Sequence, residues 1–369
     1  MILDFFNLRP DAFGLDISDL SIKLARLKRS RKGLALSSFG EVALVPGVVT
    51  GGEVKKSDQL VLAIKKAMKD VKGKPLDTKW AVVSLPEEKA FLQVVQLPQM
   101  KQEQIENAVR FEAENYIPYS LDTVYLDSQV ITPLVRNHLD HMDVLLASLP
   151  RPAVDAYLSV IQKAGIMPLA FEIESLSIAR SVIPNEVTAA PQLIIDLGAM
   201  RTSFIIFAGS SLRFTASIPI SSVQLTEHIA KSLKIDFKQA EYTKLHYGLA
   251  GVNDPEGKEV FDALIPPLTD LLEQIKKHMS FYESHSDHQH LPVRQRAIKK
   301  VLLCGGGANL PGLPEFLRKE LDLDVKLGNP WSNILPSPLR EVPGMPFKDS
   351  MHYTTALGLA LRGVRIDYD

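Results

Sequence analysis

Two short segments of the chain, about 180 residues apart, follow the same pattern of residue types. The first covers residues 14–24 and the second covers residues 194–204. In each, an apolar run leads into an aspartate, Asp16 or Asp196, and small or turn-forming residues follow before a second apolar run. This pattern predicts two β-hairpins with an aspartate at the tip of each. Because each copy opens its own half of the chain, we expect two equivalent domains that hold one nucleotide between them.

Length, composition and charge limit the class of protein. The chain has 369 residues, more than the ~250–300 at which single cores stop growing, so we expect two or more cores. With 42 basic and 43 acidic residues, the net charge of −1 gives no overall field for nucleic acid or anionic lipid. The single cysteine, Cys304, excludes an intrachain disulfide. No apolar run approaches the ~20 residues of a membrane helix, and the start of the chain lacks a basic signal-peptide region. We therefore expect a soluble, cytoplasmic, multidomain protein that does not bind nucleic acid.

The first half of the chain alternates between strand and helix patterns. After the first hairpin, a third strand is expected at residues 33–45, a helix at 57–71 with Ser57 as its N-cap, and a strand at 80–85. Residues 86–165 differ from this pattern. They predict a compact α+β insertion with strands at 91–97, 123–131 and 142–149 and helices at 102–115 and 152–163.

The second half repeats the first. A strand at 168–173 and a helix at 175–182 precede the second hairpin, and a third strand is expected at 212–218. Further helices are expected at 222–233, 237–247, 260–285, 313–321 and 353–361, with a strand at 297–303. The order strand–strand–strand–helix thus occurs twice, with an insertion in each half. This is the duplication expected of an α/β, actin-like or ribonuclease H-like, two-lobe fold, which sugar kinases and Hsp70-type proteins share.

Hairpin tips of this composition suit a nucleotide phosphate site. Tight turns offer backbone N–H groups and hydroxyls to phosphate oxygens, and an aspartate holds a magnesium ion through water. Asp16 and Asp196 are therefore the candidate metal contacts, although each also fits a turn residue that satisfies local N–H groups. The candidate phosphate contacts are Ser21, Lys23, Arg201 and Thr202.

A run of three glycines, Gly305, Gly306 and Gly307, directly follows the strand at 297–303 and Cys304. Glycines at a strand end let the backbone approach a ligand closely, and the following helix turns its N-terminus toward it. The alternative is a turn that only needs positive φ. Combined with the two hairpins, the run indicates part of a nucleotide site.

Three other features have two readings each. Glu241 and Lys244 lie three residues apart and therefore on one helix face. They form either a surface ion pair or contacts to a nucleoside. His285, His288 and His290 form a histidine-rich segment without well-placed acids, which favours a solvated loop over a metal site. Cys304 lies in an apolar strand, which favours a small buried residue over a nucleophile.

Additional segments carry a resemblance to a known family. Residues 112–121 read Glu-Ala-Glu-Asn-Tyr-Ile-Pro-Tyr-Ser-Leu, and residues 124–127 read Val-Tyr-Leu-Asp. Together with the two hairpins, the pairs Leu225-Thr226, Ile229-Ala230 and Ala240-Glu241, and the run 305–313, they make nearly the whole chain similar to the type IV pilus assembly protein PilM family. That family is related to the cell-division protein FtsA.

The resemblance implies a division into four subdomains. The first lobe would contain subdomain 1A (residues 1–85, 166–190 and 340–369) and the inserted subdomain 1C (residues 86–165). The second lobe would contain subdomain 2A (residues 191–216 and 294–339) and subdomain 2B (residues 217–293).

The resemblance also implies ligands and partners. ATP with magnesium would bind in the interlobe cleft, at the cytoplasmic face of the inner membrane. A groove near 1A and 1C would take the N-terminal cytoplasmic segment of a PilN-like membrane protein, and we expect Tyr116 and Tyr119 to contribute to it. Association with the membrane would be indirect, through this partner, and the family connects the envelope assembly to cytoplasmic motor ATPases.

Matched position by position, the family pattern implies roles for the candidate site residues. The first phosphate loop would contain Asp16, Ser18, Ser21 and Lys23, and the second would contain Asp196, Gly198, Arg201 and Thr202. The adenosine motif would be Gly305, Gly306 and Gly307, and the nucleoside would be lined by Glu241 and Lys244.

The sequence departs from the family pattern at two places. Ser18 and the pair Ser221-Ser222 stand where glycines often approach the phosphates, so added side chains would crowd a triphosphate. Glu174 is the candidate for orienting an attacking water, but it also fits a partner of the helix dipole. We therefore expect at most a slow ATPase.

Two other functions remain open within the same fold. A filament-forming, FtsA-like division protein would need a C-terminal basic amphipathic helix, and the chain ends instead in Arg365-Ile366-Asp367-Tyr368-Asp369. A small-molecule kinase, such as a sugar or acetate kinase, would need a general base and an acceptor pocket, for which Glu174 is the sole candidate found.

Overall fold

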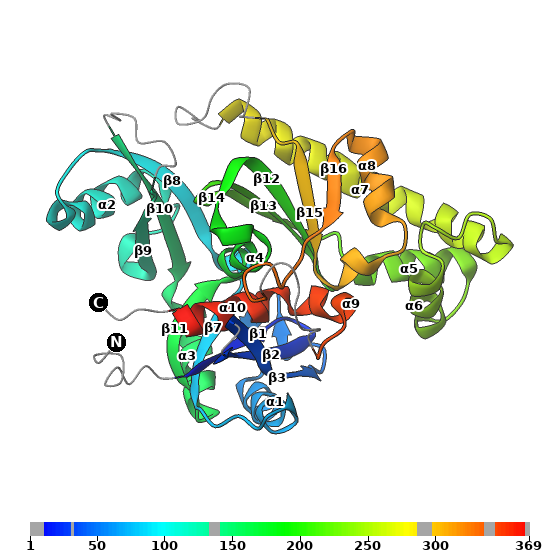
Figure 1. The fold of residues 1–369 in the computed structure, drawn as a ribbon, viewed down its shortest axis with the longest axis horizontal. Coiled ribbons are helices and arrows are strands. Elements are labelled where there is room, and N and C mark those ends of the chain that lie inside the picture. Colours follow the sequence, from blue (N-terminus) through cyan, green and yellow to red (C-terminus); the bar gives the residue numbers. More distant parts are fainter. Residues whose placement is uncertain (1–10, 31–32, 133–140, 286–296, 336–343, 366–369) are drawn as a thin grey trace.

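The computed structural model describes residues 11–30, 33–132, 141–285, 297–335 and 344–365. The predicted His288 and His290 and the terminal residues 366–369 lie outside these segments. Figure 1 shows two sheet-based lobes, with a smaller third sheet beside the second lobe. Within the described segments, no helix combines the length and the apolar character needed to cross a membrane.

The first lobe is built on a six-stranded sheet in the order β11-β7-β1-β2-β3-β6. Its strands are β1 (Ala12–Ile17), β2 (Ser21–Ser30), β3 (Gly33–Ala43), β6 (Lys72–Gly73), β7 (Trp80–Leu85) and β11 (Met167–Ile173). The pairs β1–β2 and β2–β3 are antiparallel, whereas β7 is parallel to both β1 and β11. The residues at the centre of this sheet are apolar on both faces, as expected for strands that helices cover on both sides.

The second lobe is built on a five-stranded sheet in the order β14-β13-β12-β15-β16. Its strands are β12 (Thr188–Leu197), β13 (Thr202–Gly209), β14 (Ser211–Ile218), β15 (Lys300–Cys304) and β16 (Asp324–Leu327). Here too, the first three strands pair antiparallel and the last two run parallel to β12.

The two sheets therefore share one topology. Read from the third strand, β3-β2-β1-β7-β11 corresponds strand for strand to β14-β13-β12-β15-β16. The predicted hairpins are β1–β2 and β12–β13, and the predicted α/β duplication is confirmed. The edge strand β16 was not predicted, because its four residues follow a charged helix and contain only two apolar side chains.

Helices fill the space around and between the sheets. Those of the first lobe are α1 (Ser57–Lys69) and α3 (Arg151–Lys163), and those of the second are α5 (Ser222–Leu233), α6 (Phe237–His246), α7 (Pro255–His285) and α8 (Leu313–Leu321). The α1 helix starts one residue earlier than predicted, with Lys56 as its N-cap, so Ser57 is already inside the helix and caps nothing.

Two further helices pack against each other at the centre of the molecule in Figure 1, namely α4 (Glu174–Val182) and α10 (Thr354–Arg365). Gly14 lets α10 approach β1, because a Cβ atom there would lie 2.2 Å from the carbonyl oxygen of Ala356. Gly358 plays the same part against α4, since its Cβ would lie 1.9 Å from the carbonyl oxygen of Ser177. Glycine at both positions therefore sets the close packing of these helices.

The insertion forms its own three-stranded sheet, in the order β8-β10-β9. Its elements are β8 (Phe91–Pro98), α2 (Gln102–Tyr116), β9 (Val124–Val130) and β10 (His141–Pro150). The following helix, α3, buries Tyr157, Val160 and Ile161 in the core of the first lobe rather than in that of the insertion. The insertion also contacts the second lobe, where Arg213 of β14 lies 2.5 Å from a carboxylate oxygen of Asp143 on β10.

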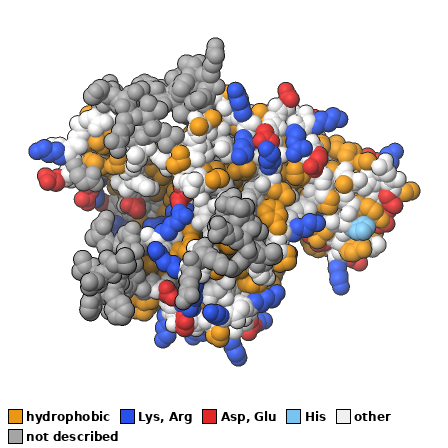
Figure 2. Space-filling view, viewed as in Figure 1, with side chains coloured by type: hydrophobic (Ala, Val, Ile, Leu, Met, Phe, Trp, Pro, Cys, Tyr) orange, Lys and Arg blue, Asp and Glu red, His pale blue; other side chains and the backbone are white. Residues whose placement is uncertain are grey.

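Acidic and basic side chains lie among apolar ones on the face shown in Figure 2. This mixture agrees with the near-zero net charge of the chain.

Candidate functional site: a cavity between the lobes

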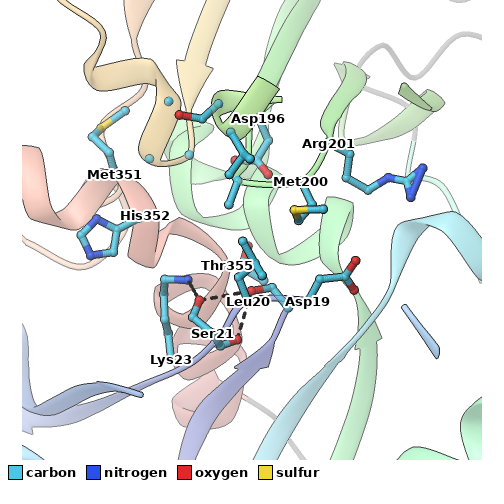
Figure 3. Close-up of a pocket in the computed structure, with 18 of the residues that line it drawn as sticks. Asp19, Leu20, Ser21, Lys23, Asp196, Met200, Arg201, Met351, His352 and Thr355 are labelled. Atoms are coloured by element: carbon cyan, nitrogen blue, oxygen red, sulfur yellow. Dashed lines mark hydrogen bonds between the residues drawn. The ribbon is translucent and has the colours of Figure 1, made fainter. Parts of the chain in front are cut away.

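A cavity of about 630 Å³ lies where the tips of the two equivalent hairpins meet. This volume is within the range of small-molecule sites. Figure 3 shows that its side chains come from both lobes, with Lys23 and Ser21 on one side and Asp196 and Arg201 on the other. The candidate residues that line it are Asp16, Ser18, Ser21, Lys23, Glu174, Asp196, Gly198, Arg201, Glu241, Lys244, Gly305, Gly306 and Gly307.

The tip of the first hairpin is ordered by hydrogen bonds within itself. The backbone N–H of Ser18 donates to the carbonyl oxygen of Ser21 at 2.9 Å, and the Ser18 hydroxyl donates to the same oxygen at 3.0 Å. Lys23 donates to the Ser21 hydroxyl at 2.5 Å (Figure 3). Asp19 accepts from the N–H groups of Gly51 and Gly52, which anchors the tip to the loop between β4 (Val49–Thr50) and β5 (Glu53–Val54). The Ser18 side chain is thus used to close the turn.

The tip of the second hairpin is closed by the backbone. The N–H of Gly198 donates to the carbonyl oxygen of Arg201 at 2.9 Å, and its own carbonyl accepts from Ser222 at the start of α5. Thr202 is fully buried and is absent from the cavity lining. Its hydroxyl donates to the carbonyl oxygen of Ile220 at 2.7 Å, so the structure does not bring Thr202 together with the other predicted phosphate contacts.

The two aspartates occupy equivalent places, each at or next to the end of the first strand of its hairpin. Ser84, on the neighbouring parallel strand β7, donates its hydroxyl to a carboxylate oxygen of Asp16 at 3.2 Å. Asp196 has Cys304 as its partner on the equivalent strand β15, and burial raises the pKa of this thiol well above its usual range. Burial and the negative charge of Asp16 raise the pKa of Asp196 to about 6. Burial also raises the pKa of Asp16, against the opposing effect of Lys23.

Glu174 begins α4 and also lines the cavity. Burial, followed by the charges of Asp16 and Glu88, raises its pKa well above the ordinary value of a glutamate. Among the described residues, no three histidine, cysteine, aspartate or glutamate side chains are grouped so that they hold a metal ion directly. Asp16 and Asp196 present two carboxyl groups to one cavity, and carboxylate oxygens are donors that a hard divalent cation accepts while it keeps several waters.

The glycine run follows β15 and forms a close-fitting edge of the cavity. Gly305 has a φ of +81°, and a Cβ there would lie 2.5 Å from a carboxylate oxygen of Asp196. At Gly307 a Cβ would lie 2.5 Å from the Leu197 side chain. At Gly306 the nearest atom would be 3.5 Å away, which is ordinary contact. Two of the three glycines are thus required by close packing against the end of β12.

Glu241 and Lys244 lie together on α6, facing α5. Lys244 is buried and donates to the carbonyl and hydroxyl of Ser222, to the Thr226 hydroxyl and to Glu241, at distances between 2.7 and 3.0 Å. Glu241 also accepts from Thr226. The ion pair forms, but Lys244 is buried, so the pair is not the surface ion pair that the sequence suggested. Both residues line the cavity, and their contact with a nucleoside stays a prediction.

Some lining residues were not predicted. Glu88 lies in the 3₁₀ turn Glu87–Lys89 and pairs with Arg201 at 2.8 Å. His352 lies 3.3 Å from Glu41, which is 3.7 Å from Lys23. These residues come from elements far apart in the sequence and carry no local motif, so only the fold reveals them.

Tyr116, Tyr119, Cys304 and His285 are not among the residues that line the cavity. Tyr116 and Tyr119 are about half exposed, at the end of α2 and just beyond it. Cys304 is fully buried, as predicted for a small core residue. His285 ends α7 and stacks on Phe281.

Two lobes of equal topology, joined by α4 and α10 and meeting at a cavity between equivalent hairpin tips, define the actin-like class of proteins. Within this class, the chain belongs to the family described as type IV pilus assembly protein PilM, whose model matches residues 14–364.

Solved structures agree with this assignment. A PilM–PilN type IV pilus biogenesis complex matches with a TM-score of 0.80 and 26% identity, over 97% of this chain and 100% of that one. MreB5 of Spiroplasma citri bound to AMPPNP matches with a TM-score of 0.57 and 12% identity, over 96% of each chain, which shows the shared fold.

The curated relatives include the cell division protein FtsA from two bacteria. The protein from Neisseria meningitidis serogroup B is 23% identical over 222 residues, which cover 56% of this chain and 51% of the relative. The protein from Streptococcus pneumoniae is 26% identical over 204 residues, which cover 50% of this chain and 42% of the relative. The chain thus spans about half the length of the curated relatives it matches.

Proposed function

We propose that the protein is a nucleotide-binding scaffold of the type IV pilus assembly machinery, located at the cytoplasmic face of the inner membrane. The observation that carries this proposal is the cavity between two equivalent hairpin tips, in a chain that belongs to the PilM family. Membership of the family supports the role in pilus assembly, and the cavity supports a ligand that joins the two lobes.

The proposed ligand is ATP with magnesium. Lys23 and Arg201 would provide positive charge to the phosphates, together with Ser21 and the backbone N–H groups of both tips. Asp16 and Asp196 would hold the cation through water. The close-packed edge at Gly305 and Gly307 would approach the nucleoside, with Glu241 beside it. When bound, the cation would supply positive charge near Asp16 and Asp196, which would offset the charge of Asp16 that, after burial, raises the pKa of Asp196.

We propose that hydrolysis is slow at most. A base that orients water must be ionised, and burial beside Asp16 and Glu88 keeps the pKa of Glu174 well above its usual range. The raised pKa favours the protonated form of Glu174, which makes this residue a poorer general base than an ordinary glutamate. This property suits a protein whose output is a contact with a partner.

The proposed partner is the N-terminal cytoplasmic segment of a PilN-like membrane protein. The matched complex of PilM with PilN supports this choice. Tyr116 and Tyr119 present partly exposed aromatic rings on the insertion, and exposed aromatic side chains are enriched among residues that dominate binding energy. Through this partner the scaffold would reach the membrane and the pilus motor proteins.

We also propose a division into subdomains that follows the packing. The insertion (1C) would comprise residues 86–150, because α3 packs into the core of the first lobe. Subdomain 2A would comprise the second sheet, from Thr188 to the end of β14 at Ile218 and again from β15 onward. The helices α5, α6 and α7 would form 2B.

A peptide-binding experiment tests the partner role. A fluorescent peptide with the N-terminal sequence of the neighbouring PilN-like protein is titrated with the full chain, with and without Mg-ATP, and anisotropy is measured. We expect binding that weakens about tenfold or more in Tyr116→Ala/Tyr119→Ala, as for aromatic hot spots. The control is Tyr242→Ala, an exposed tyrosine on α6 of the second lobe. Absence of binding in both nucleotide states would contradict the role.

One observation favours a second candidate function. Curated relatives of the chain are FtsA proteins, which favours the alternative that this protein is a filament-forming, FtsA-like protein. Sedimentation with Mg-ATP separates the two candidates, since pelleted polymer is expected only for the filament. The small-molecule kinase stays a weaker alternative, because its candidate base, Glu174, has a pKa that burial raises well above its ordinary value.

A further inference from the structure

An ion pair crosses the cavity and joins its two sides. Arg201, at the tip of the second hairpin, lies 2.8 Å from a carboxylate oxygen of Glu88. The Nε atom of Arg201 donates to the Ser217 hydroxyl at 2.8 Å, which directs the rest of the guanidinium toward Glu88. Both residues of the pair line the cavity. The guanidinium proposed to meet phosphate is therefore already neutralised by a carboxylate of the protein.

Glu88 lies in the turn Glu87–Lys89, which connects β7 of the first lobe to β8 of the insertion. We call this turn the neck of the insertion. On one side, the carboxylate of Glu87 accepts from the N–H of Ser175 at the start of α4. On the other side, Lys89 donates to Glu53 at 2.6 Å. The turn is thus held by contacts on both sides of Glu88, and the pair with Arg201 adds a contact from the cavity.

The insertion also contacts the second lobe at a separate place. Arg213 on β14 pairs with Asp143 at 2.5 Å, and the Ser210 hydroxyl donates to the carbonyl oxygen of Thr132 at 2.7 Å. The pair Glu88–Arg201 is a further connection between the insertion and the second lobe, and both of its residues line the cavity.

We propose that Glu88 is an internal competitor for nucleotide phosphate at Arg201, so that binding of a nucleotide releases the neck of the insertion. This inference rests on the proposed nucleotide site. A phosphate group carries more negative charge than a carboxylate and offers more acceptor oxygens to the guanidinium. Once Arg201 binds a phosphate group, Glu88 loses its ion-pair partner in the cavity, which favours its movement away from the cavity. By linkage, a partner that holds the insertion in the released position would tighten nucleotide binding by the same factor.

A double-mutant cycle tests the competition. The affinity for Mg-ATP and for tripolyphosphate is measured by calorimetry on the wild type, Glu88→Gln, Arg201→Gln and the double variant. We expect Glu88→Gln to bind at least about fivefold more tightly, the lower end of typical coupling between sites. Arg201→Gln is expected to bind more weakly. In the Arg201→Gln background, Glu88→Gln is expected to bring no gain, because the competitor has nothing left to block.

Amide hydrogen exchange reads out the release of the neck. In the wild type, Mg-ATP is expected to speed exchange in a peptide that covers residues 86–98, and Glu88→Gln is expected to do so without nucleotide. An equal gain from Glu88→Gln in both backgrounds would show a general charge effect and overturn the competition. Unchanged exchange would overturn the release. If neither ligand binds any variant, the proposed nucleotide site itself fails, and the inference falls with it.

Discussion

Asp16 lies opposite Lys23 across the first hairpin, in the register that pairs β1 with β2. Its counterpart Asp196 lies opposite Ser203 across the second hairpin. The nearby lysine lowers the pKa of Asp16 and so opposes the effect of burial, whereas Asp196 has no cation directly across from it. The two equivalent aspartates therefore differ in their electrostatic surroundings, and burial together with the charge of Asp16 raises the pKa of Asp196 to about 6.

This asymmetry predicts that Mg-ATP binds more tightly as the pH rises through about 6. Above that pH Asp196 is ionised and attracts the hydrated cation, and below it the carboxyl is neutral. Calorimetry at pH values from 5 to 8 measures the dependence. The control is Asp196→Asn, whose remaining profile reports the titration of the nucleotide and of the other groups. Identical profiles for the two proteins would contradict the role of Asp196.

The same group predicts how stability depends on pH without nucleotide. Because the folded pKa of Asp196, about 6, lies above its ordinary value of 3.8, the folded state binds the proton more tightly than the unfolded state. The stabilisation that the protonated Asp196 contributes is therefore present at low pH and is lost as the pH rises from about 4 to about 6. We expect Asp196→Asn to raise the free energy of unfolding at pH 7 by up to about 3 kcal/mol, and by little at pH 4. Urea denaturation at both values measures this, and an equal effect at both would contradict it.

Neighbouring glycines provide a matched pair of substitutions. Gly305→Ala places a methyl group against Asp196 on a backbone with φ of +81°, so we expect a loss of about 2 kcal/mol or more and weaker nucleotide binding. Gly306→Ala meets no atom closer than 3.5 Å and is expected to change the stability little. Thermal unfolding and calorimetry of both variants compare the two effects. Similar losses at the two positions would show that the run is sensitive for another reason.

Lys244 allows its structural and ligand-binding readings to be separated. Lys244→Met removes three hydrogen bonds from α6 to α5 and the ion pair with Glu241 within α6, and it leaves buried acceptors unpaired, so we expect a loss of about 1–3 kcal/mol. Lys238→Met, at an exposed position on the same helix, is the control. If the folded Lys244→Met variant binds ATP at wild-type strength at low temperature, the residue acts by holding α6 in place. A large loss of affinity in a folded variant would show direct contact with the nucleoside.

Much of the fold was predictable because its determinants are local. The apolar strands and turn residues of both hairpins identified the duplication, and the strand at Trp80–Leu85 has the bounds that its apolar run predicts. The helix and strand patterns of the insertion were also clear, but α3 was grouped with them because sequence proximity does not reveal which core a helix enters. Its buried Tyr157 packs into the first lobe.

The site was less predictable, because its charged side chains pair with residues that are far away in the sequence. The sequence pattern predicts Thr202 as a phosphate contact. In the structure its hydroxyl donates to the Ile220 carbonyl oxygen, and Thr202 does not line the cavity. No local motif indicates Glu88 as a partner of Arg201, since 113 residues separate them. Such pairs depend on the packing of the insertion against the second lobe, which no local pattern encodes.

The central claim is that one nucleotide is held by both hairpins, and calorimetry with Mg-ATP tests it most directly. The wild type and Asp196→Asn are compared at pH 7.5, and circular dichroism confirms that both are folded. We predict binding to the wild type with a Kd in the micromolar range and binding at least about tenfold weaker in the variant, as for loss of a charged contact. Full-strength binding by Asp196→Asn would contradict the claim.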